Sequence, residues 1–312
     1  MTHAFVFPGQ GSQSIGMLDA LAADEPSVRE TFAEASSALG YDLWQLVSAG
    51  PEESLNSTER TQPALLTAGV AVWRVWQRHG GPAPACLSGH SLGEYTALVA
   101  AGALDLATAV RLVEFRGRAM QDAVPPGVGA MAAVLGLDDD AVRAACVDAA
   151  QGEVVSAVNL NSPGQVVIAG NAAAVERASA GCKARGAKRV VPLPVSVPSH
   201  CGLMRPAADA LEQRLATTEL RTPSIPVIQN LDAQSHQDPV AIKHALVAQL
   251  YSPVRWVECV TALKARGATR IVECGPGKVL AGLVKRIDKE LEGMAMFDPT
   301  TLAAARTALE AR

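Results

Sequence analysis

Short apolar runs alternate along most of the chain with longer segments whose apolar residues recur every three or four positions. This alternation predicts buried strands separated by amphipathic helices, the pattern of an α/β protein. The elements predicted in this way are strands at residues 4–7, 85–88, 225–229 and 270–273 and helices at residues 26–39, 61–79, 105–124 and 300–312. Two or three helices therefore separate the first strand from the second.

The pattern changes in the middle of the chain, where two halves each follow the order strand, helix, strand. The predicted elements are strands at residues 130–135, 154–159, 165–169 and 188–195 and helices at residues 138–150 and 172–185. The order βαββαβ is that of a ferredoxin-like module. We therefore expect a large α/β subdomain of residues 1–127 and 198–312 and an inserted small subdomain of residues 128–197, with a cleft between them.

Composition narrows the class of protein. The chain has 312 residues, 49% of them apolar and 19% charged, which is enough apolar material for a substantial core. A net charge of -4 gives no electrostatic footprint for nucleic acid. The apolar run at the N-terminus is too short for a signal peptide, and no segment reaches about 18 uninterrupted apolar residues, so we expect a cytoplasmic protein with no membrane span.

The cysteines are scattered through the sequence. Their positions are Cys86, Cys146, Cys182, Cys201, Cys259 and Cys274. No pair has the C-x-x-C spacing, and no histidine stands at metal-ligand spacing from any of them. The sequence therefore predicts reduced thiols, with neither a zinc site nor a disulfide framework.

The strongest chemical motif is Gly89-His90-Ser91-Leu92-Gly93, which follows a predicted strand and precedes a predicted helix. A serine in the pattern Gly-x-Ser-x-Gly at such a turn is typical of a nucleophile elbow, where glycines are needed because side chains would collide. The free amides at the start of the helix, including the N–H of Leu92, could hold an oxyanion. The same five-residue pattern also arises by chance in glycine-rich turns.

A polar loop, Pro8 to Gln13, follows the first strand. It resembles a glycine loop that binds phosphate, but the third glycine would fall on Ser14 and the Walker lysine is missing, so a nucleotide site is disfavoured. Gln10, flanked by two glycines at the end of a strand, lies where α/β proteins place their ligands. The alternative is an ordinary turn from strand to helix.

Arg116 is anomalous within the helix predicted at residues 105–124. Arg111 and Arg118 have acidic neighbours at helical spacing, whereas the neighbours of Arg116 are apolar. A buried arginine without a counter-ion is costly, so Arg116 is a candidate clamp for a carboxylate from elsewhere. A distant acidic residue, or a side chain that reaches the surface, would also explain it.

His200 is the candidate base among the six histidines. His90 adjoins the serine and points the wrong way, and the other four lie in predicted loops, termini or a helix face. His200 follows an apolar strand at the junction of the two subdomains, and Pro198 restricts the backbone before it. A hydrogen-bonded structural histidine is the alternative, and no acidic third member of a triad is evident.

Several motifs in order resemble one family. They are FVFPGQGSQ at 5–13, GHSLGEY at 89–95, EFRGRAMQDAVP around Arg116, NLNSPGQVVIAG at 159–170, VSVPSH at 195–200 and QLYSPVRW at 249–256. The set is similar to bacterial malonyl-CoA:acyl carrier protein transacylases over residues 4 to about 290. The resemblance implies an α/β-hydrolase-like core with a parallel sheet and a ferredoxin-like insertion.

The resemblance also implies an activity and partners. The malonyl group would pass from malonyl-CoA to the pantetheine thiol of acyl carrier protein in a ping-pong reaction through a malonyl-serine, supplying type II fatty acid synthesis. By this likeness Ser91 is the nucleophile, His200 its general acid and base, and Gln249 orients His200 through its main-chain carbonyl. No metal or other cofactor is implied, and we expect a monomer.

The remaining roles implied by the resemblance concern the substrate. Gln10 joins the N–H of Leu92 in the oxyanion site, and Arg116 binds the free malonyl carboxylate. Because acyl carrier proteins are acidic, a basic docking patch is expected, with candidates Lys183, Arg185, Lys188, Arg189, Lys285 and Arg286. Each of these charges could instead be a solvated helix end.

Three alternatives share part of this pattern. A thioesterase or esterase has the elbow and the histidine but no need of Arg116. A transacylase of malonate decarboxylase or of polyketide assembly has the same motifs and a different acceptor. A docking module without catalysis is disfavoured because every chemical residue is present.

Overall fold

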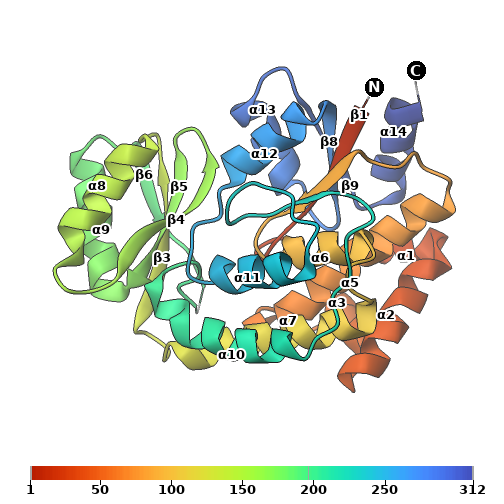
Figure 1. Cartoon of the computed structure of the whole chain (residues 1–312), viewed down its shortest axis with the longest axis horizontal. Helices are drawn as coiled ribbons and strands as arrows, with labels where there is room; N and C mark the ends of the chain where they lie inside the picture. Colours follow the sequence, from red (N-terminus) through yellow and green to blue (C-terminus); the bar gives the residue numbers. More distant parts are fainter. Residues whose placement is uncertain (1, 196, 311–312) are drawn as a thin grey trace.

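The structure, a computed structural model, describes residues 2–195 and 197–310 and consists of two lobes, each built on its own β-sheet (Figure 1). Sheet A has the strand order β7-β2-β1-β8-β9, and all its pairs are parallel. Its strands are β1 (Thr2–Phe7), β2 (Cys86–Gly89), β7 (Val227–Ile228), β8 (Ala268–Cys274) and β9 (Glu292–Met296). The predicted α/β core with a parallel sheet is confirmed.

The central strands of sheet A bring two loops together. β1 pairs with β2 in the register Phe7 to Gly89, so the two strands end side by side. Because both strands point the same way, the loop after β1, which contains Gln10, adjoins the turn after β2, which contains Ser91. The parallel pairing therefore joins two motifs that lie about 80 residues apart in the sequence.

Helices cover both faces of sheet A. Those preceding the small lobe are α1 (Asp19–Asp24), α2 (Pro26–Leu39), α3 (Leu43–Ala49), α4 (Glu52–Leu55), α5 (Thr58–Arg78), α6 (Gly93–Ala100) and α7 (Leu106–Ala123). Those following it are the 3₁₀ turn η1 (Gly202–Met204) and α10 (Arg205–Ala216), α11 (Pro239–Gln249), α12 (Trp256–Ala265), α13 (Val279–Ile287) and α14 (Pro299–Glu310). The last two residues of the helix predicted at 300–312 lie outside the described part of the chain.

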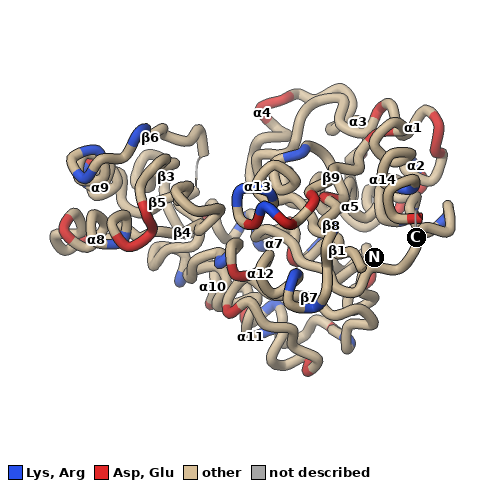
Figure 2. Tube along the Cα trace, turned by 90° about the horizontal axis from the view of Figure 1, so that it is seen from above, with Lys and Arg blue, Asp and Glu red and all other residues tan. Residues whose placement is uncertain are grey.

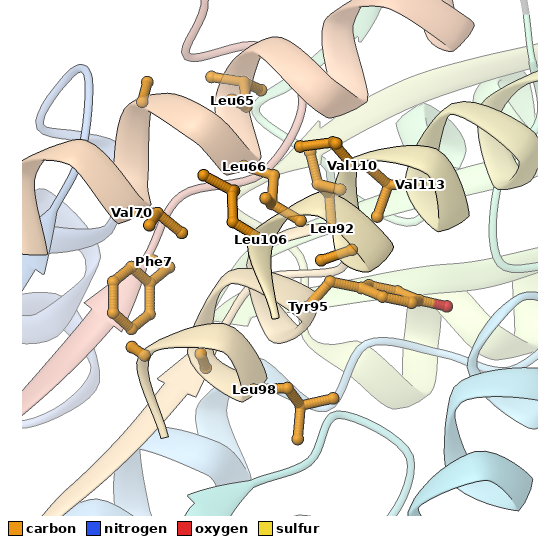
Figure 3. Packing of buried hydrophobic residues seen from close by; sticks show 14 of the residues in the cluster. Phe7, Leu65, Leu66, Val70, Leu92, Tyr95, Leu98, Leu106, Val110 and Val113 are labelled. Carbon is orange, nitrogen blue, oxygen red and sulfur yellow. The ribbon is translucent and has the colours of Figure 1, made fainter. Parts of the chain in front are cut away.

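Helix α6, which follows the turn at Ser91, is enclosed by the core. Leu92, Tyr95 and Leu98 pack among apolar side chains of β1, α5 and α7, such as Phe7 and Leu66 (Figure 3). These side chains are at most 1% exposed. Burial on this scale holds the start of α6 in one position relative to sheet A.

Sheet B forms the small lobe, at the left of Figure 1, with the order β4-β5-β3-β6 and antiparallel pairing throughout. Its elements are β3 (Gly129–Leu135), α8 (Asp139–Ala150), β4 (Val155–Ser162), β5 (Gln165–Asn171), α9 (Ala172–Ala184) and β6 (Arg189–Pro192). The βαββαβ order is confirmed. Its own apolar cluster, which includes Val134 and Ile168, lies between the sheet and the two helices.

Two features of the small lobe bear on the sequence predictions. The last strand ends at Pro192 instead of residue 195, since the prolines at 192 and 194 each lack an N–H for a further ladder bond. The subdomain boundaries at residues 127/128 and 197/198 stay a prediction, and sheet B lies inside them. Within residues 2–195 and 197–310, no helix is long and apolar enough to cross a bilayer.

Candidate active site

The turn after β2 holds Ser91 in a left-handed backbone conformation, with φ of 51°. The main-chain N–H of Ser91 donates to Asn230 Oδ1 at 2.7 Å, which stabilises this strained geometry. A Cβ atom at Gly89 would lie 1.9 Å from the carbonyl carbon of Gly93, and one at Gly93 would lie 2.1 Å from the carbonyl oxygen of Phe7. Both glycines are therefore required sterically, as the elbow motif predicts.

Gly93→Ala is expected to lower the free energy of unfolding by about 3 kcal/mol, because the added methyl collides with backbone that cannot move aside. Gly282→Ala is the matched control, since nothing lies within 4 Å of its added methyl and alanine favours the helix by about 1 kcal/mol. Urea denaturation followed by circular dichroism measures both variants. Equal stability of Gly93→Ala and the wild type would contradict the steric account.

His200 lies between Ser91 and the main chain of α11. Its Nε2 is 2.8 Å from Ser91 Oγ, and its Nδ1 is 2.7 Å from the carbonyl oxygen of Gln249. A carbonyl oxygen only accepts, so Nδ1 carries the proton and Nε2 is free to accept from the serine hydroxyl. The carbonyl thus occupies the position that an acidic residue has in a Ser-His-Asp triad.

The environment of His200 favours its neutral form. The side chain is 3% exposed, and burial, followed by the positive charge of Arg116, lowers its pKa from 6.5 to about 3. The hydrogen bond to the Gln249 carbonyl opposes this shift without cancelling it. Above that pKa the imidazole is neutral and able to accept a proton.

The ring of His200 is therefore expected to show no titration between about pH 5 and pH 8, since its pKa lies well below this range. Histidine-selective NMR over this range measures it, with His200→Gln used to assign the signal. A His200 signal that titrates near the ordinary value of 6.5 would contradict the environment described here.

Arg116 projects from α7 to Ser91 and is 1% exposed. Its guanidinium donates to Gln62 Oε1 at 2.8 Å, to Gln249 Oε1 at 3.0 Å and to Ser91 Oγ at 3.3 Å. It also lies 5.4 Å from the centre of the Tyr95 ring. Its hydrogen-bond partners in the described part of the chain are thus neutral, and its burial excludes the alternative of a side chain that reaches the surface. Burial lowers the pKa of Arg116, and the charges of Tyr95 and Glu94 oppose this shift without a direct ion pair.

A cleft of about 650 Å³ lies between the two lobes above Ser91. Five of the six predicted site residues line it, namely Gln10, Ser91, Leu92, Arg116 and His200. Gln249, the sixth, is fully buried directly behind them. The structure therefore brings together all six residues.

The two predicted oxyanion donors, Gln10 and Leu92, line the same cleft as Ser91. Within the described residues, the N–H of Leu92 has no acceptor in the protein. Gln10 lines the same cleft as Ser91, and its side-chain Nε2 donates to Thr58 Oγ1 at 3.5 Å. The N-terminus of α6, the positive end of its helix dipole, also favours a negative charge beside Ser91.

Comparison with known proteins identifies the family. The family model described as "Acyl transferase domain" matches residues 4–299. The chain belongs to the acyl transferase family. The resemblance seen in the sequence motifs is thereby confirmed, and the protein is an acyltransferase.

The relatives of this acyltransferase are similar over nearly their whole length. It is 61% identical over 302 residues to the malonyl CoA-acyl carrier protein transacylase of Escherichia coli O157:H7, covering 97% of this chain and 98% of the relative. It is 46% identical over 303 residues to the protein of the same name from Bacillus subtilis (strain 168), covering 97% and 95%.

Solved structures agree. An acyl carrier protein S-malonyltransferase from Vibrio cholerae O1 is 62% identical with a TM-score of 0.96, covering 97% of this chain and 99% of that one. A malonyl-transacylase in complex with its type II PKS acyl-carrier protein is 56% identical with a TM-score of 0.98, covering 99% and 100%.

The acyltransferase has a buried acid near Ser91 that the sequence reasoning missed. Glu94 is 0% exposed, and burial raises its pKa from 4.5 to about 7. It could have been found in the same way as Arg116, because it is a charged residue in an otherwise apolar helix. Asn230, also missed, follows β7 and is marked only by its position at the end of a strand.

The predicted docking residues of the acyltransferase fall into two groups in Figure 2, one at α9 and β6 and one at α13. In the first group Arg185 forms an ion pair with Asp148. In the second, Arg286 donates to Gln165 Oε1 at 3.0 Å and so connects α13 to the small lobe. The basic docking patch stays a prediction.

The described residues of the acyltransferase contain no group of three or more His, Cys, Asp or Glu side chains that could hold a metal ion. The cysteine side chains are buried free thiols, as expected. The expectation that no cofactor is needed stays a prediction, as do the cytoplasmic location and the monomeric state.

Proposed function

We propose that this acyltransferase moves the malonyl group from malonyl-CoA to the pantetheine thiol of an acyl carrier protein by a ping-pong reaction through a malonyl-Ser91 intermediate. The enzyme would thereby supply malonyl groups on the carrier protein to type II fatty acid synthesis. The observation that carries the proposal is the buried guanidinium of Arg116, 3.3 Å from the oxygen of a serine that is hydrogen-bonded to a histidine.

Arg116 supports the choice of acyl group. A guanidinium held at Ser91 by neutral hydrogen-bond partners favours an acyl chain that ends in a carboxylate, because the anion can pair with it directly. Malonyl carries such a carboxylate and acetyl does not. Close relatives named malonyl CoA-acyl carrier protein transacylase support the same substrate.

The first half-reaction would acylate Ser91. As Ser91 Oγ attacks the thioester carbonyl carbon, His200 Nε2 takes the hydroxyl proton. The oxyanion that forms would accept hydrogen bonds from the amides of Leu92 and Gln10. When the carbon–sulfur bond breaks, His200 returns the proton to the sulfur, and CoA leaves as a thiol.

The second half-reaction would reverse these steps with a different thiol. The pantetheine thiol of the carrier protein gives its proton to His200 and attacks the ester carbonyl carbon of malonyl-Ser91. Ser91 then leaves and takes the proton back from His200. The Gln249 carbonyl keeps the proton of the neutral ring on Nδ1 in both halves.

The acceptor is inferred from the cleft and from a relative. The cleft of about 650 Å³ has an apolar wall that includes Met131, Leu193 and Val197, which suits the pantetheine arm common to CoA and to carrier proteins. The malonyl-transacylase solved with its acyl-carrier protein supports a phosphopantetheinylated carrier as the acceptor.

A comparison of two acceptors tests the proposal against a thioesterase. With malonyl-CoA as donor, steady release of CoA is expected only when a pantetheine thiol or a loaded carrier protein is present, and malonyl-pantetheine should accumulate. Steady release of CoA and free malonate in water alone would show a hydrolase instead.

A further inference from the structure

Glu94 is a buried carboxyl group in the first turn of α6 that does not line the cleft. It lies three residues after Ser91, and the mechanism proposed above does not use it. Removing such a group from water is costly unless hydrogen bonds compensate. The proposed mechanism therefore does not explain why a carboxyl group is buried so close to Ser91.

Three donors converge on the Glu94 carboxyl group. The main-chain N–H of Asn230 donates to Oε2 at 2.8 Å, and Gln249 Nε2 donates to the same oxygen at 3.0 Å. Gln229 Nε2 donates to Oε1 at 3.2 Å. The carboxyl group thus links the end of β7 and the end of α11 to the start of α6.

The bond from Gln249 has a consequence for Arg116. An amide side chain has one donor end and one acceptor end, and Oε2 of Glu94 only accepts. The donor end of Gln249 is therefore turned to Glu94, where it also donates to the carbonyl oxygen of Ser91 at 3.1 Å. The acceptor end is left to face the guanidinium of Arg116 at 3.0 Å.

If the Gln249 amide turned over, its NH₂ group would face the guanidinium, donor against donor. That contact is repulsive, and it would displace the guanidinium from the nucleophile or leave one of its N–H groups unpaired. The main-chain carbonyl of Gln249, which accepts from His200, would not be affected by the turn. The side chain and the main chain of Gln249 thus serve different partners.

We propose that Glu94 is a positioning residue for selection of the acyl group: its Oε2 atom, together with the carbonyl oxygen of Ser91, fixes the orientation of the Gln249 amide, which in turn holds the Arg116 guanidinium beside Ser91. The inference rests on the proposed function, because it requires Arg116 to bind the malonyl carboxylate. Glu94 itself touches no substrate in this account.

The arrangement is compatible with either protonation state of Glu94. Within the described residues, Gln229 Oε1 is buried without a partner, so a turned Gln229 amide could accept a proton carried by Oε1 of Glu94. Oε2 would then still accept from Gln249. The titratable groups that act on Glu94 or are affected by its charge are Arg116 of α7, Tyr95 of α6 and Cys259 of α12.

Two variants separate the hydrogen bond from the charge. Glu94→Met keeps the volume and removes the acceptor, so we expect kcat/KM for malonyl-CoA to fall about 10- to 100-fold, the cost of a buried donor left unpaired. Transfer from acetyl-CoA should fall much less. Glu94→Gln keeps an acceptor for Gln249, so we expect kcat/KM for malonyl-CoA and for acetyl-CoA to stay within about threefold of the wild type.

Glu273→Met is the matched control. Glu273 is also 0% exposed with a pKa raised to about 7 by burial, but it accepts from the N–H of Ala281 at 2.8 Å at the start of α13. It does not line the cleft. Glu273→Met should lower stability, measured by thermal denaturation, while the malonyl-to-acetyl ratio of kcat/KM stays unchanged.

Three results would overturn the inference. The first is a folded Glu94→Met enzyme that keeps the wild-type malonyl-to-acetyl ratio of kcat/KM. The second is a fall of this ratio that is equally large in Glu94→Met and Glu94→Gln. The third is a fall of the same size in Glu273→Met. If Glu94→Met does not fold, Gln249→Leu replaces it, because it removes the side-chain amide and keeps the carbonyl that binds His200. A wild-type ratio in Gln249→Leu would then overturn the inference.

A different result is expected if the proposed function itself is wrong. In that case the wild-type enzyme would transfer no malonyl group, whatever the state of residue 94. The inference about Glu94 fails only where the wild type prefers malonyl-CoA and the variants without the acceptor keep that preference.

Discussion

Replacing Ser91 with alanine is expected to lower malonyl transfer by about 10⁴- to 10⁶-fold, the loss typical of a missing serine nucleophile. Without Oγ no acyl-enzyme can form. The acceptor thiol would then have to attack malonyl-CoA directly, in place of the two half-reactions in which His200 transfers the proton. The assay follows malonyl-pantetheine formed from malonyl-CoA and a pantetheine thiol, with binding of malonyl-CoA measured separately by calorimetry.

Ser88→Ala is the matched control for that loss. Ser88 lies three residues earlier in β2, is fully buried, and donates to the carbonyl oxygen of Ile228 at 2.9 Å. Its removal should cost about 1 kcal/mol of stability and leave transfer intact. If Ser91→Ala retained transfer at the level of Ser88→Ala, a covalent route through Ser91 would be untenable.

Arg116→Ala is expected to lower kcat/KM for malonyl-CoA by about 10²- to 10³-fold, the cost of removing one member of a buried charged pair. Transfer from acetyl-CoA should fall much less, because that substrate has no carboxylate to bind. The preference for malonyl over acetyl is therefore expected to disappear. Arg116→Lys should recover only part of it, since an ammonium lacks the planar fork of the guanidinium.

Arg118→Ala is the control for the loss of a positive charge on the same helix. Arg118 is 56% exposed on its side chain and pairs with Glu59 at the surface, so its removal should leave both substrates unaffected. An Arg116→Ala enzyme that still prefers malonyl-CoA would assign selectivity to another residue.

The elements and residues that the sequence predicted well are those with a local signature. The elbow glycines follow from a steric rule within five residues, and a Cβ atom at Gly89 or Gly93 does collide with backbone. Arg116 stands out against an apolar helix face, and its side chain is buried, which the sequence had left open. The βαββαβ order followed from the period of the apolar residues, which changes between strand and helix.

What the sequence could not supply depends on contacts between distant segments. The acidic neighbour that Arg111 and Arg118 share at helical spacing is Glu114, but Glu114 binds Arg60 of α5 at 3.1 Å. Gln249 acts through a carbonyl that every residue has, so no side-chain pattern marks it. Asn230 and Glu94 are more than 130 residues apart in the sequence. Their hydrogen bond forms because β7 and β2 are neighbours in the sheet.

The boundaries of some elements were also displaced for physical reasons. Helix α5 begins at Thr58, before the predicted start at residue 61, and continues through Pro63. Pro63 lies past the first turn, so its missing N–H removes one helical hydrogen bond, and the helix continues because most of its other side chains are buried in the core. The strand predicted at residues 225–229 is reduced to Val227–Ile228, whose partners in sheet A are Leu87 and Ser88 of β2.

The central claim is that Ser91 carries the malonyl group between two thiols, and intact mass with peptide mapping tests it most directly. The enzyme is mixed briefly with malonyl-CoA, or with acetyl-CoA in parallel, and a pantetheine thiol is then added. The account predicts a malonyl adduct on the peptide containing Ser91, formed in preference to acetyl, stable in water and discharged by the thiol. Free malonate without an adduct, or an adduct on another residue, would contradict it.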